Sequence, residues 1–294
     1  MVVVGVTSVV AQILVSFAAS LASDSERGSV VGTVMSGLLL GVLLARTVAG
    51  FVADAAGWRA VYWLAAALMV AMAALLRLEL PRNHERTGLT YPKLLAPIVA
   101  IVVDEPVLRW RSVYGALAFA SFSVLWTSLA FLLGGASYHY GVGTIGLFGL
   151  FGLVGAAGAV MASAAGRLAD RGRTRLLTGA TSTRLLISYL GIWLGGHSLA
   201  ALLAGVVVLD IGAQGLHITN QAEIYRLRPD ARSRVNAAYM TCYFIGGAVG
   251  SALSVALYGA FGWDGVALLG ACFGAATLVV WARQSRSGSG TITR

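Results

Sequence analysis

Long apolar runs, separated by short polar segments, make up most of the chain. Nine such runs can be marked, at 2–22, 29–53, 59–80, 112–134, 142–165, 175–196, 198–222, 235–258 and 262–282. Their apolar residues are continuous rather than alternating, and each run has the roughly 20 residues that a helix needs to cross a bilayer. Backbone polar groups in lipid must pair within their own segment or in a closed barrel. The pattern therefore predicts an all-α, polytopic membrane protein with about nine transmembrane helices.

The first run could also be a cleaved signal peptide, because small residues at 18–23 resemble a signal-peptidase site. A signal peptide has a basic start and an apolar core of only about 7–15 residues. No basic residue precedes Arg27, and the apolar stretch is longer than such a core. We therefore predict that this run is a membrane helix.

Composition excludes a separate soluble domain. Hydrophobic residues make up 58% of the 294 residues, charged residues 11%, and the mean hydropathy is +0.81. The net charge of +9 would suit nucleic-acid binding in a soluble protein, but the basic residues lie in short loops between apolar runs. We expect the lipid bilayer as a partner and no nucleic acid.

Cys242 and Cys272 lie in different runs without metal-ligand spacing, so we expect no metal site there.

The distribution of basic residues predicts the orientation. With the N-terminus outside, 18 of the 21 Lys and Arg residues fall on the inner side, whereas Arg59 alone falls outside. The inner loops would be 23–28, 81–111, 166–175, 223–234 and 283–294. Cytoplasmic loops carry the excess of positive charge. We therefore expect a multi-pass protein of the bacterial inner membrane with a cytoplasmic C-terminus.

An internal repeat relates the first three runs to the last three. At a constant interval of 205 residues, identical residues recur as Met35 and Met240, Gly41 and Gly246, Gly57 and Gly262, and Trp58 and Trp263. Many transporters consist of such repeats, with the binding site between them. Both copies cross the membrane in the same direction, so we predict two parallel bundles.

The repeat also predicts how the chain is divided. Residues 1–80 would be the last three helices of an N-terminal half, and 81–111 a cytoplasmic linker containing a short surface helix at 94–103. Residues 112–294 would be a six-helix C-terminal half with a short tail. The helices at 112–196 have no repeat partner within the chain. We therefore expect a complete protein of twelve helices, with about 95 more residues before residue 1.

One inner loop, Gly166-Arg-Leu-Ala-Asp170-Arg171-Gly172-Arg173-Thr-Arg175, carries a motif. It resembles the glycine-aspartate-arginine gating-loop signature of the major facilitator superfamily, with one residue fewer than the common pattern. The resemblance assigns Gly166, Asp170, Arg171, Gly172 and Arg173 to a gate. Asp170 and the arginines could make charge-assisted hydrogen bonds to a neighbouring helix and close one side. The alternative is a basic loop that only sets topology.

Small residues recur along the second run as Gly37-x-x-x-Gly41-x-x-x-Ala45-Arg46-x-x-x-Gly50. This spacing lets helix backbones approach closely. It also resembles the glycine-rich fifth helix of the drug:proton antiporter branch of the superfamily, although the usual proline is absent. Glycines at 143, 146, 149, 152, 155 and 158 form a similar stripe on the fifth run. Packing is the simpler role for both stripes.

Polar residues at membrane depth are the candidate site residues, because such groups need a cavity or a partner. Asp210, Gln214, His217 and Gln221 share one face of the seventh helix, and Gln12 and Ser16 occupy the matching face of the first. Arg46 and Arg184 lie near mid-depth on two other helices. Asp210 could carry a coupling proton, with His217 near it. It could instead neutralise Arg184 or Arg46 as a structural pair.

The resemblance implies a secondary active transporter that exports small organic solutes in exchange for protons by alternating access, without a cofactor. An enzyme is not expected, since the sequence shows no paired catalytic carboxylates, no His-x-x-x-His metal pair and no nucleophile–base constellation. The alternative function is that of a truncated membrane fragment that does not transport.

Overall fold

The computed structural model describes residues 27–79, 91–148, 174–228 and 231–287, and the regular elements within these ranges are helices. They are α3 (Arg27–Ala56), α4 (Trp58–Glu79), α5 (Tyr91–Asp104), α6 (Pro106–Gly134), α8 (Thr174–Leu194), α9 (Leu199–Leu227) and α10 (Arg232–Ser287). A further helical segment, 142–148, continues beyond the described range. The all-α fold predicted from the continuous apolar runs is confirmed.

Four of the described helices are long and apolar enough to cross a membrane: Trp58–Glu79, Pro106–Gly134, Leu199–Leu227 and Arg232–Ser285. The predicted run at 2–22 and most of that at 142–165 lie outside the described residues, so the count of nine helices stays a prediction. Elsewhere the runs and helices coincide closely. The chain is a multi-pass, all-α membrane protein.

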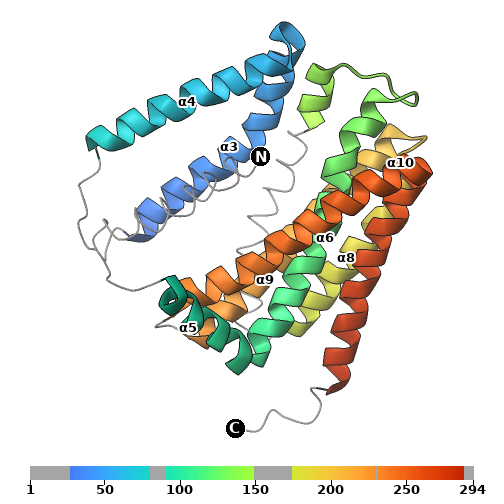
Figure 1. The fold of residues 1–294 in the computed structure, drawn as a ribbon. Helices are drawn as coiled ribbons and strands as arrows, with labels where there is room; N and C mark the ends of the chain where they lie inside the picture. The colour runs from blue at the N-terminus through green and yellow to red at the C-terminus, as the bar shows by residue number, and fades with distance from the viewer. Residues whose placement is uncertain (1–26, 80–90, 149–173, 229–230, 288–294) are drawn as a thin grey trace.

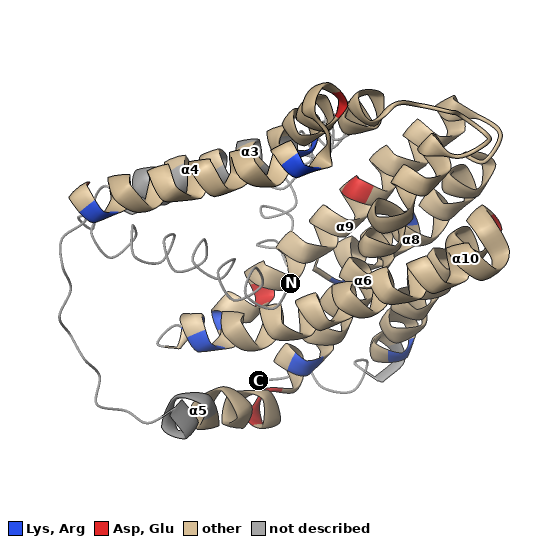
Figure 2. Cartoon of the chain, turned by 45° about the horizontal axis from the view of Figure 1, so that its top comes forward, with Lys and Arg blue, Asp and Glu red and all other residues tan. Residues whose placement is uncertain are grey.

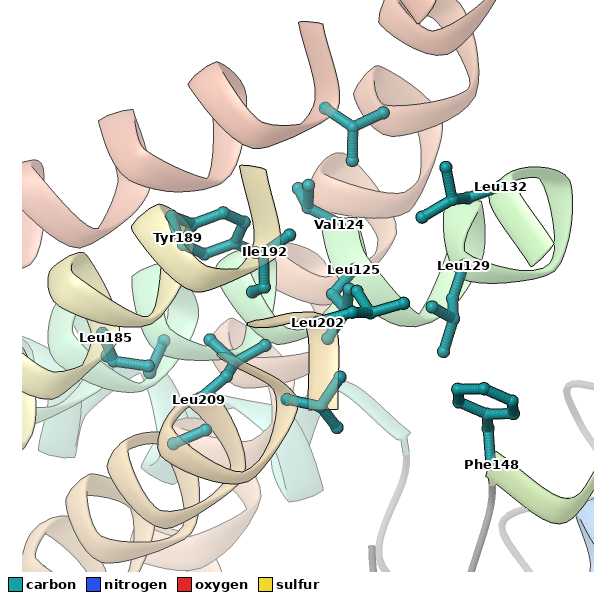
Figure 3. Packing of buried hydrophobic residues seen from close by; sticks show 14 of the residues in the cluster. Val124, Leu125, Leu129, Leu132, Phe148, Leu185, Tyr189, Ile192, Leu202 and Leu209 are labelled. Atoms are coloured by element: carbon teal, nitrogen blue, oxygen red, sulfur yellow. The ribbon is translucent and has the colours of Figure 1, made fainter. Parts of the chain in front are cut away.

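Helices α6, α8, α9 and α10 pack into one bundle, while α3 and α4 form a separate hairpin beside it (Figure 1). The bundle core contains Leu125, Leu185, Leu202 and Leu209, all fully buried (Figure 3). Tyr189 adds a hydrogen bond of 2.5 Å from its hydroxyl to the carbonyl oxygen of Ser121. This bond joins α8 to α6 and satisfies a polar group that would be costly to leave unpaired in the core.

The long element α10 consists of two helical arms that meet at Gly262, where φ is 63° and ψ is −148°. In the first copy of the repeat, α3 and α4 meet at Gly57, whose φ is 81°. Both glycines occupy the left-handed region that residues with a Cβ rarely adopt. A positive φ at equivalent positions agrees with the internal repeat predicted from the sequence.

The linker contains the short helix α5, longer than the predicted 94–103. Its Ile101 is buried against Leu108, Ile224 and Tyr239, whereas Val103 is exposed. The helix thus packs by one face on the ends of α6, α9 and α10.

Figure 2 shows most Lys and Arg residues at helix ends, with largely uncharged helix centres between them.

The structure corrects the placement of Arg111. The sequence pattern put this residue in the inner loop, before a helix starting at 112. Instead, α6 begins at Pro106, and proline is favoured in the first turn because its missing N–H would be unpaired there. Arg111 is therefore one and a half turns inside the helix, and its side chain is buried.

Candidate functional site

Asp210 lies in the middle of α9 and is only 4% exposed. Its Oδ1 atom accepts a hydrogen bond of 3.4 Å from the indole Nε1 of Trp126 on α6. A carboxylate at membrane depth requires a partner or a cavity. Trp126 supplies the hydrogen bond, and the remaining charge compensation comes from another helix.

That compensation comes from Arg46 of α3, which interacts electrostatically with Asp210. The Arg46 guanidinium carbon lies over the Trp126 ring, 3.9 Å from its centroid. Such a cation–π contact contributes about 0.5–2 kcal/mol, depending on desolvation. The indole thus contacts both charged groups: its face meets the cation, and its N–H meets the carboxylate. The arrangement joins the hairpin α3–α4 to the bundle.

A cavity of about 460 Å³ opens beside this arrangement, between α3 and α4 on one side and α6 and segment 142–148 on the other. Its volume falls within the range of about 300–1,000 Å³ typical of small-molecule sites. Arg46 is the one charged residue among the described residues that line it, and the aromatic side chains are those of Trp58, Tyr62 and Trp126. Asp210 is bonded to the edge of the Trp126 ring and is not among the described residues of the cavity wall.

At the end of the helices near Gly57, α3 packs tightly on segment 142–148. Thr47 is buried, and its hydroxyl donates a hydrogen bond of 3.1 Å to the carbonyl oxygen of Gly146. A Cβ atom placed on Gly50 would lie 2.9 Å from the Gly146 Cα. The stripe of small residues predicted to pack therefore does so at Gly50, whereas Gly37 and Gly41 have no described neighbour within 4 Å of such an atom.

His217 lies two helical turns beyond Asp210 and makes different contacts. Its Nδ1 atom is 3.0 Å from the hydroxyl of Tyr239. Asn220 connects this pair to Arg111, because its Nδ2 lies 3.5 Å from the same hydroxyl and its Oδ1 accepts a bond of 3.3 Å from Arg111. Arg111 also donates a bond of 2.9 Å to Thr178. These five residues tie α6, α8, α9 and α10 together.

The other predicted site residues lie apart from the cavity or outside the described ranges. Gln214 and Arg184 are exposed, and Gln221 is half-buried. None of the described contacts of Asp210 runs to Arg184, so the structure favours Arg46 as its charge partner. Gln12 and Ser16, as well as the gating-loop residues Gly166, Asp170, Arg171, Gly172 and Arg173, lie outside the described residues. Their roles stay predictions.

The sequence did not single out Trp126 or Tyr239. Trp126 lies within a continuous apolar run, where an aromatic residue is indistinguishable from a core residue. Its role depends on Arg46, 80 positions earlier, and Asp210, 84 positions later. Arg111 was noticed only as a topology charge. The signal that could have identified it is the apolar sequence around it, since Val107, Leu108 and Trp110 just before the run could extend the helix past Arg111.

The hairpin α3–α4 lies beside the bundle, with Arg46 and the cavity at their junction, an arrangement suited to a membrane protein of the transporter class. The profile of the Major Facilitator Superfamily matches residues 1–188 and 156–293. The chain is 52% identical over 279 residues to an "Uncharacterized transporter YgaY" of Escherichia coli O157:H7, which covers 95% of this chain and 70% of the relative. The same figures hold for the "Putative uncharacterized transporter YgaY" of Escherichia coli strain K12.

A further relative is the "Probable transporter SCO4007" of Streptomyces coelicolor, 37% identical over 267 residues, or 90% of this chain and 61% of that protein. The chain belongs to the Major Facilitator Superfamily. It is thus a membrane transporter of small molecules rather than an enzyme, as the sequence predicted.

Proposed function

We propose that this protein is a secondary active transporter that couples movement of a small organic solute to protons by alternating access, with Asp210 as the proton-carrying group. The observation that carries the proposal is the position of Asp210. It is buried on α9, bonded to Trp126 at the edge of the cavity, and electrostatically linked to Arg46 on the opposite side. A change in its protonation alters the attraction between the two halves.

Alternating access requires two arrangements of the halves and a group whose state biases them. Ionised Asp210 attracts Arg46 through Trp126, which holds α3 near α6 and α9. Protonated Asp210 loses this attraction, and the remaining cation–π contact holds the hairpin more weakly. Proton binding and release would therefore shift the population of the two arrangements. Export, in a bacterial inner membrane with the C-terminus inside, is the direction that the antiporter resemblance implies.

The test is Asp210→Asn, measured in proteoliposomes loaded with the pH-sensitive dye pyranine. Candidate solutes of three kinds, an aromatic carboxylate, an aromatic amine and a sugar, are added in turn. We expect Asp210→Asn to abolish solute-dependent proton movement and pH-driven transport, because an amide of equal size cannot cycle a proton. Solute movement down its own gradient should survive. Asp264→Asn is the matched control, since Asp264 is exposed, does not line the cavity, and as asparagine can still accept its hydrogen bond from Trp193.

A purely structural pair gives a different result. Removing one member of a buried charge pair strands the other, at about 3–5 kcal/mol. Asp210→Asn would then reduce the amount of folded protein, and adding Arg46→Gln would restore it. Folded Asp210→Asn protein with intact pH-driven transport would contradict both roles.

The second candidate function, a fragment that does not transport, has one observation in its favour. Trp263 donates a hydrogen bond of 2.7 Å to the carbonyl oxygen of Ile192. Its repeat equivalent, Trp58, is 60% exposed, and no residue of α4 is buried. Transport assays should therefore compare the 294-residue chain with a form carrying the further helices that the repeat predicts. Transport by the longer form alone would support this candidate.

A further inference from the structure

We infer that the cavity selects organic anions with an aromatic or apolar body, and that the Arg46 guanidinium is the group that binds their acidic head. The inference rests on the proposed transport function and specifies its substrate class. It is carried by the chemistry of the cavity wall and by the contacts of Arg46.

The wall of the cavity combines one cation with aromatic rings. Arg46 is exposed and lines the cavity. Trp58, Tyr62 and Trp126 also line it, and the other described lining residues are small or aliphatic. The walls therefore offer apolar and aromatic contact area and a single charged anchor. Sites of this composition orient a ligand through a few polar groups and bind its body through apolar contacts.

Arg46 can still bind an anion in this position. The Trp126 ring covers one face of its guanidinium. No ion pair to Arg46 occurs within the described part of the chain. Asp210 attracts Arg46 electrostatically but is itself hydrogen-bonded to Nε1 at the edge of the Trp126 ring. The planar N–H groups of the guanidinium can thus donate to a carboxylate in the two-bond geometry that arginine favours. A cationic ligand would meet the same charge as a repulsion.

Other charged groups near the cavity do not reverse this preference. On α3, Asp54 lies against Gly143, near the Gly57 end of the contact between α3 and segment 142–148. On α4, the guanidinium carbon of Arg59 lies over the Trp58 ring, 4.5 Å from its centroid. Segment 142–148 carries no charged residue, and the charged residues of α6 lie near its other end. Arg184 of α8 is exposed beside Gly212. Arg46 is therefore the charge that a ligand in the cavity meets first.

Asp210 makes anion binding depend on pH. When Asp210 is ionised, its negative charge weakens the attraction between Arg46 and an anion. When it is protonated, Arg46 acts alone, and the anion binds more tightly. Protonation of Asp210 thus raises the affinity for the anion, and by linkage the bound anion raises the affinity of Asp210 for the proton. This sign is the one expected for movement of both in the same direction, so an anionic substrate would be carried together with protons and not in the exchange that the antiporter resemblance implies.

The experiment compares three probes of matched shape by titration calorimetry on the purified chain: 2-naphthoate, the neutral 2-naphthamide and the cationic 2-naphthylmethylammonium. We expect naphthoate to bind tightest, on the order of tenfold more tightly than the amide, with the cation weakest. Tightest binding of the cation, equal binding of all three, or binding of none would overturn the inference. These comparisons use the unaltered protein, so they do not depend on a variant that folds.

Variants then identify the anchor. Arg46→Gln should lower naphthoate affinity by on the order of tenfold and leave the amide unchanged, while Arg46→Lys should retain the preference for the anion. Arg77→Gln, an exposed arginine on α4, is the control. Naphthoate affinity should rise from neutral to mildly acidic pH in the unaltered protein and stay constant in Asp210→Asn. A preference for the cation together with an intact Asp210 transport phenotype would reject the substrate class but keep the proposed function.

Discussion

The contact between Gly50 and Gly146 should control access to the cavity from the Gly57 end. A Cβ atom on Gly146 would lie 2.9 Å from the Arg46 carbonyl oxygen and 3.0 Å from the Gly50 Cα. Favourable contacts between carbon atoms lie at about 3.5–4.0 Å, so Gly146→Ala should separate α3 and segment 142–148 by roughly 0.5–1 Å. The same movement stretches the hydrogen bond from Thr47 to Gly146.

The magnitude follows from the cost of overpacking, which is about 1–3 kcal/mol for an added methyl group in a tight interface. In a protein with two arrangements, that cost falls on the one in which the helices touch. The equilibrium should shift by about 5–150-fold towards the arrangement open at this end.

The assay is labelling of a cysteine placed at Ala53, a cavity-lining residue, by a membrane-impermeant maleimide in intact cells. Cys242 and Cys272 are first replaced by serine. We expect Gly146→Ala to accelerate labelling relative to the parent. Gly41→Ala is the matched control on the same helix, because its added Cβ meets no described atom within 4 Å. Equal labelling rates in both variants, normalised to the protein in the membrane, would refute the reasoning.

Two further predictions concern topology and the gating loop. A cysteine at Ser137 should label from outside the cell and one at Ser233 should not, because most basic residues mark the opposite side; reversed labelling would overturn the orientation. Asp170→Asn should leave the protein in the membrane but slow transport, because it removes the charge from the predicted lock while preserving its shape. Transport at the unaltered rate would reduce that loop to a topology signal.

The fold could be predicted largely from the sequence because each helix in lipid is a local, self-paired element. The length of an apolar run sets its bounds, and the glycines at 57 and 262 were identified as equivalent from the repeat before their shared conformation was seen. The start of α6 was placed six residues late because its first two turns contain Arg109 and Arg111. Charged side chains near a helix end resemble a loop when only hydropathy is considered.

The site was only partly predictable, because its contacts join residues far apart in sequence. Helical spacing placed Asp210 and His217 on one face but could not show that their partners are Trp126 and Tyr239. Likewise, Arg46 and Arg184 looked alike as intramembrane arginines. Only packing distinguishes them: Arg46 lines a cavity at the junction with the bundle and interacts with Asp210, whereas Arg184 lies outside the described cavity wall.

The single-residue turns at Gly57 and Gly262 have a consequence for how the protein enters the membrane. A single glycine separates α3 from α4 and one arm of α10 from the other, so neither connection contains a hydrophilic loop that could be moved across the bilayer as a separate step. The 30 residues of α3 and the 22 of α4 should therefore partition from the insertion machinery together, as should the two arms of α10. A tag inserted at either glycine would divide such a hairpin, whereas the exposed residues around Ser137 offer a site at the same end of the bundle that leaves both hairpins whole.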